Sequence, residues 1–225
     1  DVDQIEAKIK ERFSDIPAAV NPKAKEMHRI PDNKEPIIGI ITDPETSNTE
    51  ITVFWKTEPT PEELNSTDMG FFTSLLEDFV YLIMSERFND ITSKPGAPFI
   101  RASLGIGELC ETCEAVFGSI ACKDGESLTA FKAFLTEVEK MKRFGFTDAE
   151  VQRAKDNLLR MYEQQVEGAE TRQNSEFVDL YINNFFDNKP YMTPETENEI
   201  ANMLCSQINA QLLNMVVAQI IPSDK

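Results

Sequence analysis

The hydrophobic positions of the N-terminal segment indicate one short helix that is separate from the rest of the chain. Over residues 1–16 large apolar side chains recur every three to four positions, which is the period of an amphipathic helix. They are Val2, Ile5, Ile9 and Phe13. Pro17 ends this pattern, because proline lacks the N–H that a helix interior requires. Residues 18–36 hold three further prolines and show no period. We therefore predict a terminal helix of a preceding module over 1–17, a linker over 18–36 and a main domain over 37–225.

Strand patterns come next, and a long helix follows them. Residues 37–41 (IIGII) form a short apolar run, and residues 51–56 (ITVFWK) are rich in β-branched and aromatic side chains, as strands are. Residues 43–48 between them supply Asp, Pro and Asn, which favour a turn, so we predict a hairpin. From about residue 67 to 91 apolar positions cover a broad helical face, and the Lys-Pro-Gly sequence at 94–96 ends that helix.

The second half of the chain predicts two more strands and then only helices. Residues 99–106 and 112–122 alternate in a way that is typical of antiparallel strands. Apolar spacing then predicts helices over about 128–141, 147–166, 170–186, 194–204 and 206–219. The order ββαββ followed by a helical run predicts the α+β class, with an antiparallel β-sheet and helices packed on one face.

The junction KRFGFTDAEVQRAK holds the strongest local signals in the chain. Gly145 follows the last turn of one amphipathic pattern, a position where helix ends favour glycine. Thr147 can cap the next helix while Glu150, three residues later, bonds back to it, and this pair is a capping box. Phe146 and Val151 have the spacing of a hydrophobic staple. We therefore predict two helices that meet at a fixed corner.

Three stretches of the sequence resemble the pitrilysin/insulinase-like zinc peptidases. Residues 142–155 resemble their helical corner, and residues 1–17 (DVDQIEAKIKERFSDIP) resemble the helix that follows a Gly-Asp strand end in them. Residues 41–56 (ITDPETSNTEITVFWK) resemble the first hairpin of one of their later modules. In that family homologous α+β modules alternate, the first carries zinc, and the others close a chamber around the peptide substrate. The resemblance therefore implies a second, inactive module of this metallohydrolase-like type, preceded by the last helix of the first.

The zinc site of this family has no counterpart in the sequence. The resemblance implies an inverted motif, His-x-x-Glu-His, with a distal glutamate as the third protein ligand. The chain holds one histidine, His28, which lies in the predicted linker. We therefore expect no catalytic and no metal-binding residue here, and the resemblance places zinc in another module of a parent metalloendopeptidase. A periplasmic or envelope-associated bacterial parent is compatible with the resemblance, but the sequence leaves the compartment open.

The cysteines offer a second candidate metal site. Cys110 and Cys113 form a C-x-x-C pair with Cys122 nearby in the sequence, and a thiolate zinc site would need three such cysteines and a fourth ligand. No second C-x-x-C pair exists. Cysteines within strands are more simply explained as small core residues, so we expect no metal site, while the role of the three thiols stays open.

Composition and charge limit the partners. The chain has 22 basic and 39 acidic residues, a net charge of −17, which disfavours nucleic acid and anionic membrane surfaces. No apolar run approaches the roughly 18 to 20 residues that span a bilayer. We therefore expect the other modules of the parent chain and a peptide substrate as partners, with no nucleic acid and no membrane insertion.

Alternation along the strands indicates which side chains face away from the helices. Those expected beneath the helices are Ile51, Val53, Trp55, Ile100, Ala102, Leu104 and Ile106. Those expected on the opposite, open face are Thr52, Phe54, Lys56, Phe99, Arg101 and Ser103. Because aromatic, basic and hydroxyl groups together suit loose peptide contact, our candidates for substrate binding are Phe54, Lys56, Arg101 and Ser103. An ordinary solvated sheet face is the alternative.

Two further functions are compatible with the same residues. A structural scaffold or protein-interaction module of the same fold would take no part in proteolysis, and a stand-alone acidic binding domain would need no neighbouring module. A His-x-x-Glu-His motif about one module-length upstream of Asp1 would support the peptidase. Its absence there would support the scaffold.

We predict that this chain alone retains no zinc and cleaves no peptide, since a catalytic zinc takes about three protein ligands and a single histidine is present. Zinc analysis after dialysis, together with a fluorogenic peptide assay, checks this. A tightly held zinc ion in each chain, or turnover that a chelator abolishes, would contradict the prediction.

Overall fold

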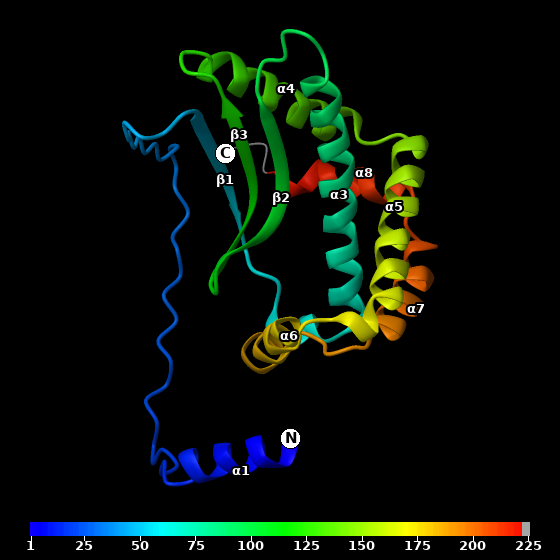
Figure 1. Ribbon diagram of the computed structural model, residues 1–225. Coiled ribbons are helices and arrows are strands. Elements are labelled where there is room, and N and C mark those ends of the chain that lie inside the picture. Colours follow the sequence, from blue (N-terminus) through cyan, green and yellow to red (C-terminus); the bar gives the residue numbers. More distant parts are fainter. Residues whose placement is uncertain (222–225) are drawn as a thin grey trace.

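A three-stranded antiparallel sheet carries helices on one face in the computed structural model, which describes residues 1–221 (Figure 1). The strands are β1 (Thr49–Thr57), β2 (Arg101–Cys110) and β3 (Cys113–Cys122). Their order in the sheet is β1-β3-β2, so β3 is central and both neighbours run antiparallel to it. The predicted α+β class is confirmed, with helices on one face of an antiparallel sheet.

The long helix predicted over about 67–91 is present as α3 (Asp68–Thr92), and a short helix that was not predicted, α2 (Glu62–Asn65), precedes it. The helical run predicted after the strands is also present, as α4 (Ser127–Phe144), α5 (Asp148–Glu167), the 3₁₀ turn η1 (Ala169–Thr171), α6 (Asn174–Asp187), α7 (Pro194–Cys205) and α8 (Ala210–Ile220). Helix α3 packs on β2 and α4 packs on β3. Helices α5 and α7 contact each other outside α3 (Figure 1). The sheet is therefore covered on one side by two layers of helix.

The predicted strand at residues 37–41 is wrong. This segment belongs to no strand, and β1 pairs with β3 alone among the described strands, so the order is βαββ. Ile37, Ile38, Ile40 and Ile41 are 81–96% exposed. A strand formed by these residues would point isoleucines to both faces of the sheet, and helices cover one face only. The isoleucines have a high β-propensity, but the fold offers no position in which a strand could bury them on both faces.

The core lies between the sheet and the helices and is rich in phenylalanine. The ring of Phe88 on α3 stacks on Phe134 of α4 with centroids 5.2 Å apart, and Phe99 meets Phe88 edge-on at 6.0 Å. Gly118 on β3 makes room for Phe134, because a Cβ atom there would lie 2.3 Å from the ring. This glycine lets α4 approach the sheet closely.

Two residues at the start of the strand predicted over 99–106 are reversed relative to the expected faces. Phe99, expected on the open face, is 3% exposed and lies in the core, whereas Ile100, expected beneath the helices, is 48% exposed. Strand β2 begins only at Arg101, so the two-residue alternation does not extend back to these positions. From Ala102 to Ile106 the expected assignment holds, with Ala102, Leu104 and Ile106 all packed against the core.

Helix α1 (Val2–Phe13) lies at one end of the molecule, and an extended connector joins it to β1 (Figure 1). No residue of α1 is buried. Hydrogen bonds attach the connector to β1 and to the β2–β3 turn. Lys56 Nζ donates to the carbonyl oxygen of Pro31 at 2.6 Å, and Thr112 Oγ1 donates to that of His28 at 2.9 Å. The assignment of residues 1–17 to a preceding module stays a prediction.

The predicted corner and its capping box are confirmed. Gly145 has φ +66° and its N–H donates to Met141 O at 2.8 Å, which closes α4. The Thr147 hydroxyl accepts from the Glu150 N–H at 3.3 Å, and the Thr147 N–H donates to Glu150 Oε2 at 2.8 Å. The local pattern of the sequence thus becomes the junction between α4 and α5.

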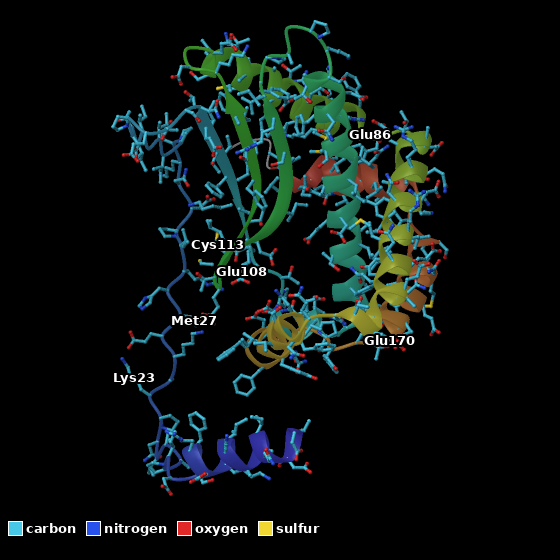
Figure 2. All side chains as sticks on the ribbon, viewed as in Figure 1. Lys23, Met27, Glu86, Glu108, Cys113 and Glu170 are labelled. Carbon is cyan, nitrogen blue, oxygen red and sulfur yellow. The ribbon has the colours of Figure 1, made fainter. Side chains whose placement is uncertain are left out.

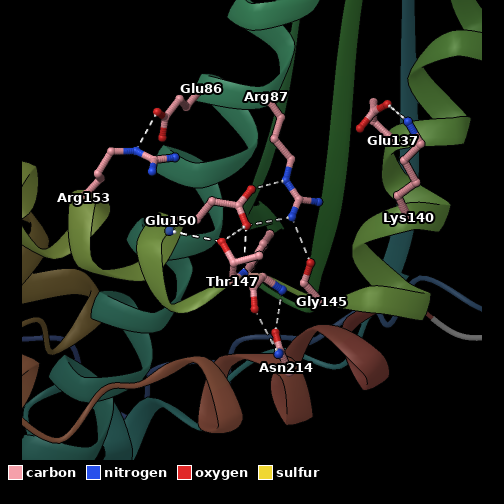
Figure 3. A network of polar contacts seen from close by, with 10 residues as sticks. Glu86, Arg87, Glu137, Lys140, Gly145, Thr147, Glu150, Arg153 and Asn214 are labelled. Carbon is pink, nitrogen blue, oxygen red and sulfur yellow. Dashed lines mark hydrogen bonds and ion pairs between the residues drawn. The ribbon is translucent and has the colours of Figure 1, made fainter.

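Long-range polar contacts then connect this corner to two other helices (Figure 3). Arg87 on α3 donates to both carboxylate oxygens of Glu150, at 2.7 and 3.1 Å, and to the Gly145 carbonyl at 2.9 Å. The Asn214 side chain on α8 accepts from the Phe146 N–H at 2.6 Å and donates to its carbonyl at 3.1 Å. The side chains of Arg87 and Glu150 are 19% and 15% exposed, so solvent screens this pair only in part.

The pKa of Glu150 reflects these contacts. Partial burial by itself would raise that pKa, but hydrogen bonds from Arg87 and Thr147 outweigh the effect and lower it to about 2. The folded-state pKa therefore lies below the unfolded value of 4.5. The stability that Glu150 contributes is present above pH 4.5 and is lost as the pH falls towards 2.

We predict that Thr147→Ala lowers the free energy of unfolding by about 0.5–2 kcal/mol, the usual cost of losing an N-cap. Glu150→Ala should cost about 1–3 kcal/mol, because it also leaves the partly buried Arg87 without its acceptor. The double mutant should cost less than the sum, since the two residues share hydrogen bonds. Urea melts check this, with Thr136→Ala on the exposed face of α4 as the control. Strict additivity would contradict the coupling.

Candidate functional site

The face of the sheet opposite the helices is built from alternate residues of all three strands. The register places them in four rows across the sheet: Glu50–Ala121–Arg101, Thr52–Ser119–Ser103, Phe54–Phe117–Gly105 and Lys56–Ala115–Gly107. The intervening residues, among them Leu104, Val116 and Ile120, lie in the core. This surface, which we call the open face, therefore carries a charged row, a hydroxyl row and an aromatic row.

The centre of the open face is aromatic. Phe117 on the central strand is directly opposite Phe54 on β1, and their side chains are 37% and 51% exposed. On the other side of Phe117 stands Gly105 of β2. A Cβ atom at Gly105 would lie 2.7 Å from the Phe117 ring, and one at Gly107 would lie 3.6 Å from it. The Phe117 ring thus rests on the bare backbone of β2 at a place where only glycine fits.

Sequence reasoning missed Phe117. It assigned faces on β1 and β2 but not on β3, although the same two-residue period runs from Cys113 to Cys122. Extending that period would have placed Phe117 and Ser119 beside the expected candidates. The Gly-x-Gly sequence at 105–107 was a second signal, because paired glycines on a strand often mark the close approach of another group.

The four candidate residues share this face, but their surroundings differ. Arg101 pairs with Glu50 at 2.5 Å across Ala121, and both side chains are exposed. An exposed ion pair is worth about 0–1 kcal/mol, so an acidic ligand could compete for the guanidinium at little cost. Ser103 lies in the hydroxyl row with Thr52 and Ser119.

Lys56 is positioned less favourably for ligand contact. Its ammonium group donates to Pro31 O, and the side chain is half-buried against the connector. Nearby, Lys25 of the connector pairs with Glu111 at the β2–β3 turn at 2.5 Å. The connector therefore borders the open face at this end of the sheet and accepts one of the three Lys56 N–H donors. Phe54, Arg101 and Ser103 are the candidates whose surroundings leave them open to a ligand.

A pair of carboxylates lies on the helical side of the same end of the sheet. Glu114 at the start of β3 accepts from the Thr60 N–H at 2.9 Å. Partial burial, the negative charge of Glu114 and that of Asp78 raise the pKa of Glu77 on α3 to about 7. Glu77 is therefore about half protonated at neutral pH. The sequence contained no signal for this shift, because it depends first on the burial of Glu77 and then on Glu114, which is distant in the sequence.

The described part of the chain does not fit a zinc ion. Within residues 1–221 no three His, Cys, Asp or Glu side chains are grouped so as to hold a metal. His28 is exposed in the connector, 3.9 Å from Glu26. All four cysteines carry free thiols, and burial raises the pKa of Cys113 and Cys122, and that of Cys205 to about 11. These three are neutral thiols at physiological pH, which are poor ligands and poor nucleophiles.

Comparison with known families matches residues 1–158, more than half of the chain, to the Peptidase M16 inactive domain. The chain belongs to this family. The resemblance to insulinase-like zinc peptidases noted in the sequence is thereby confirmed, and the inactive M16 domain agrees with a chain whose described residues do not fit zinc. Comparison with curated proteins gave no match.

Solved structures with the same fold include several proteases. The first half of the periplasmic protease PqqL from Escherichia coli has a TM-score of 0.77 at 18% identity over 98% of this chain and 46% of that one. An insulinase family protease of Yersinia pestis gives 0.77 at 15% identity over 97% and 46%. The ferredoxin protease FusC, in complex with Arabidopsis ferredoxin, gives 0.62 at 13% identity over 100% and 25%. The chain described here thus spans less than half the length of each of these chains.

Within residues 1–221 no helix combines the length and the apolar character that crossing a bilayer requires.

We predict that Glu77→Gln changes the pH dependence of stability. The folded-state pKa of Glu77, about 7, lies above the ordinary value of 4.5. The stability that Glu77 contributes to the wild-type protein is therefore fully present below pH 4.5 and is lost as the pH rises through 7. Between about pH 5.5 and 8, the free energy of unfolding of the variant should rise relative to that of the wild type by on the order of 1 kcal/mol. Urea melts at both pH values check this, with the exposed Glu63→Gln as control. Parallel pH curves for wild type and Glu77→Gln would contradict it.

Proposed function

We propose that this M16 inactive domain helps to enclose and hold a peptide substrate in a zinc metallopeptidase, while another module supplies zinc and catalysis. The observation that carries the proposal is the open face, where Phe54 and Phe117 stand exposed at the centre of the sheet and helices pack only on the opposite side (Figure 1). A sheet face without a covering layer meets either solvent or a ligand.

The chemistry of the open face supports weak contact with many sequences. Two exposed phenyl rings can shield apolar side chains from water, at about 25 cal/mol for each Å² buried. The hydroxyl row of Thr52, Ser119 and Ser103 can donate to or accept from a peptide backbone. Such contacts position a chain without selecting one residue. This is what a chamber wall needs.

The relatives support a role in a larger protease. FusC is a ferredoxin protease whose structure contains ferredoxin, so a chain that includes this fold binds a protein. Since this chain covers 46% or less of the matched chains named above, the catalytic residues would come from the remainder. A structural scaffold without proteolysis is the second candidate, and it is favoured by the lack of a zinc-binding group within residues 1–221.

The experiment uses the parent peptidase with Phe54→Ala or Phe117→Ala. If the open face holds peptide before and during the reaction, each change removes uniform binding, so KM should rise and kcat should stay nearly constant. A loss of about 1 kcal/mol corresponds to about a fivefold rise in KM. Leu128→Ala, an exposed leucine on α4, is the matched control.

Steady-state kinetics on several unrelated peptides give the answer. A rise in KM for most peptides with Phe54→Ala and Phe117→Ala, and none with the control, supports peptide holding. An unchanged KM for all peptides, with the variants folded by circular dichroism, leaves only the scaffold role.

A further inference from the structure

The β2–β3 hairpin carries two cysteines at the positions that close its turn. Strand β2 ends at Cys110 and strand β3 begins at Cys113, and the register of the sheet makes the two residues direct partners. Residues that face each other in an antiparallel pair have Cα atoms about 4.5–5.5 Å apart. A disulfide needs about 4.4–6.8 Å between its Cα atoms. The backbone therefore holds these two free thiols at a separation that a disulfide can bridge.

Both side chains lie on the same side of the sheet. Directly opposed residues of an antiparallel pair point to the same face. The two-residue period of β3 places Cys113 on the side of Ala115 and Phe117, which is the open face. Burial, and after it the neighbouring Cys110, raise the pKa of the Cys113 thiol. Because a charge acts on a pKa only over short distances, the two sulfur atoms are close enough to interact.

The two thiols differ in their access to solvent. Cys113 is 4% exposed, whereas Cys110 is only half-buried. The connector between α1 and β1 passes this end of the hairpin, where Thr112 Oγ1 donates to His28 O. Figure 2 shows Cys113 at this end of the sheet, where the connector passes. A reagent in solution therefore reaches Cys110 first, while Cys113 is sheltered.

We propose that Cys110 and Cys113 form a reversible thiol–disulfide exchange site, and that its reaction partner is a small-molecule disulfide of the glutathione type. The Cys110 thiolate attacks one sulfur of the oxidised reagent, which breaks the S–S bond of the reagent, forms a mixed disulfide and releases one thiolate. The Cys113 thiolate then attacks the Cys110 sulfur and releases the second thiolate. Two protein thiols are thus oxidised to one disulfide, the reagent is reduced to two thiols, and two protons pass from the cysteines to the leaving thiolates.

The geometry accounts for the second step although Cys113 is a neutral thiol at physiological pH. A neutral, sheltered thiol reacts slowly with a disulfide in solution. Its attack on the mixed disulfide is intramolecular, however, because the register holds Cys113 beside Cys110. A high effective concentration offsets a small thiolate fraction. The sheltered thiol therefore resolves the mixed disulfide without being open to reagents itself.

The other two cysteines lack such a partner. Cys122 faces Thr49 across the sheet, Cys205 is the last residue of α7, and both side chains are fully buried. They are therefore controls within the same chain. The exchange site requires no bound peptide, so it stands independently of the substrate-holding role of the open face.

The experiment equilibrates the full chain with mixtures of reduced and oxidised glutathione and maps its thiols by alkylation and peptide mass spectrometry. The peptide that contains Cys110 and Cys113 should lose both thiols and the mass of two hydrogen atoms, while Cys122 and Cys205 stay free. In concentrated urea the same disulfide should form with an equilibrium constant about tenfold lower, because the register no longer holds the pair together.

Two variants separate the two steps. Cys113→Ser removes the resolving thiol, so Cys110 should accumulate a stable glutathione adduct. Cys110→Ser should leave Cys113 free of glutathione, because Cys113 is sheltered. Circular dichroism reports whether each variant is folded.

The wild-type chain can overturn the proposal by itself. Free thiols at both positions at every glutathione ratio would do so, and so would a glutathione adduct on Cys110 that persists in the presence of Cys113. Oxidation of Cys122 or Cys205 to the same extent, or a disulfide that forms equally well in urea, would show that the hairpin register does not create the site.

Discussion

The ion pair between Arg87 and Glu150 is the interaction on which the helical layers depend. Glu150 closes the capping box of α5, and Arg87 joins that cap to α3 and to the Gly145 carbonyl at the end of α4. The Asn214 side chain on α8 joins this helix to the same corner through two hydrogen bonds with the backbone of Phe146. Four helices thus meet at a corner whose charges are only partly screened, where a lost partner leaves a costly unpaired group.

Because these helices are gathered on one side, the sheet presents two faces of different character. Each face uses one glycine to admit a phenyl ring: Gly118 receives Phe134 inside the core, and Gly105 supports Phe117 on the open side. The first contact brings α4 close to the sheet and excludes water. The second holds an aromatic ring where a ligand can reach it. A phenyl ring packed on a glycine therefore stabilises the core on one face and supports the proposed binding role on the other.

The remaining apolar surface is consistent with a domain of a multi-domain M16 protease. The isoleucines of residues 37–41, the apolar residues of α1 and those of α6 are exposed together in this chain. Such surfaces are unusual for an isolated acidic protein, because hydrophobic burial is the main favourable term in folding.

The sequence by itself determined what depends on neighbours a few residues apart. The capping box at Thr147 and Glu150, the helical run and the open-face positions of Phe54, Arg101 and Ser103 follow from periods of two to four residues. Only the tertiary structure decided what depends on distant partners. Residues 37–41 lack a surface to cover both of their faces, and Arg87 binds Glu150 63 residues away. Phe117 rests on Gly105, and burial together with the charge of Glu114 raises the pKa of Glu77. Local patterns specify which side chains point together, but burial and charge proximity arise only when separate elements pack.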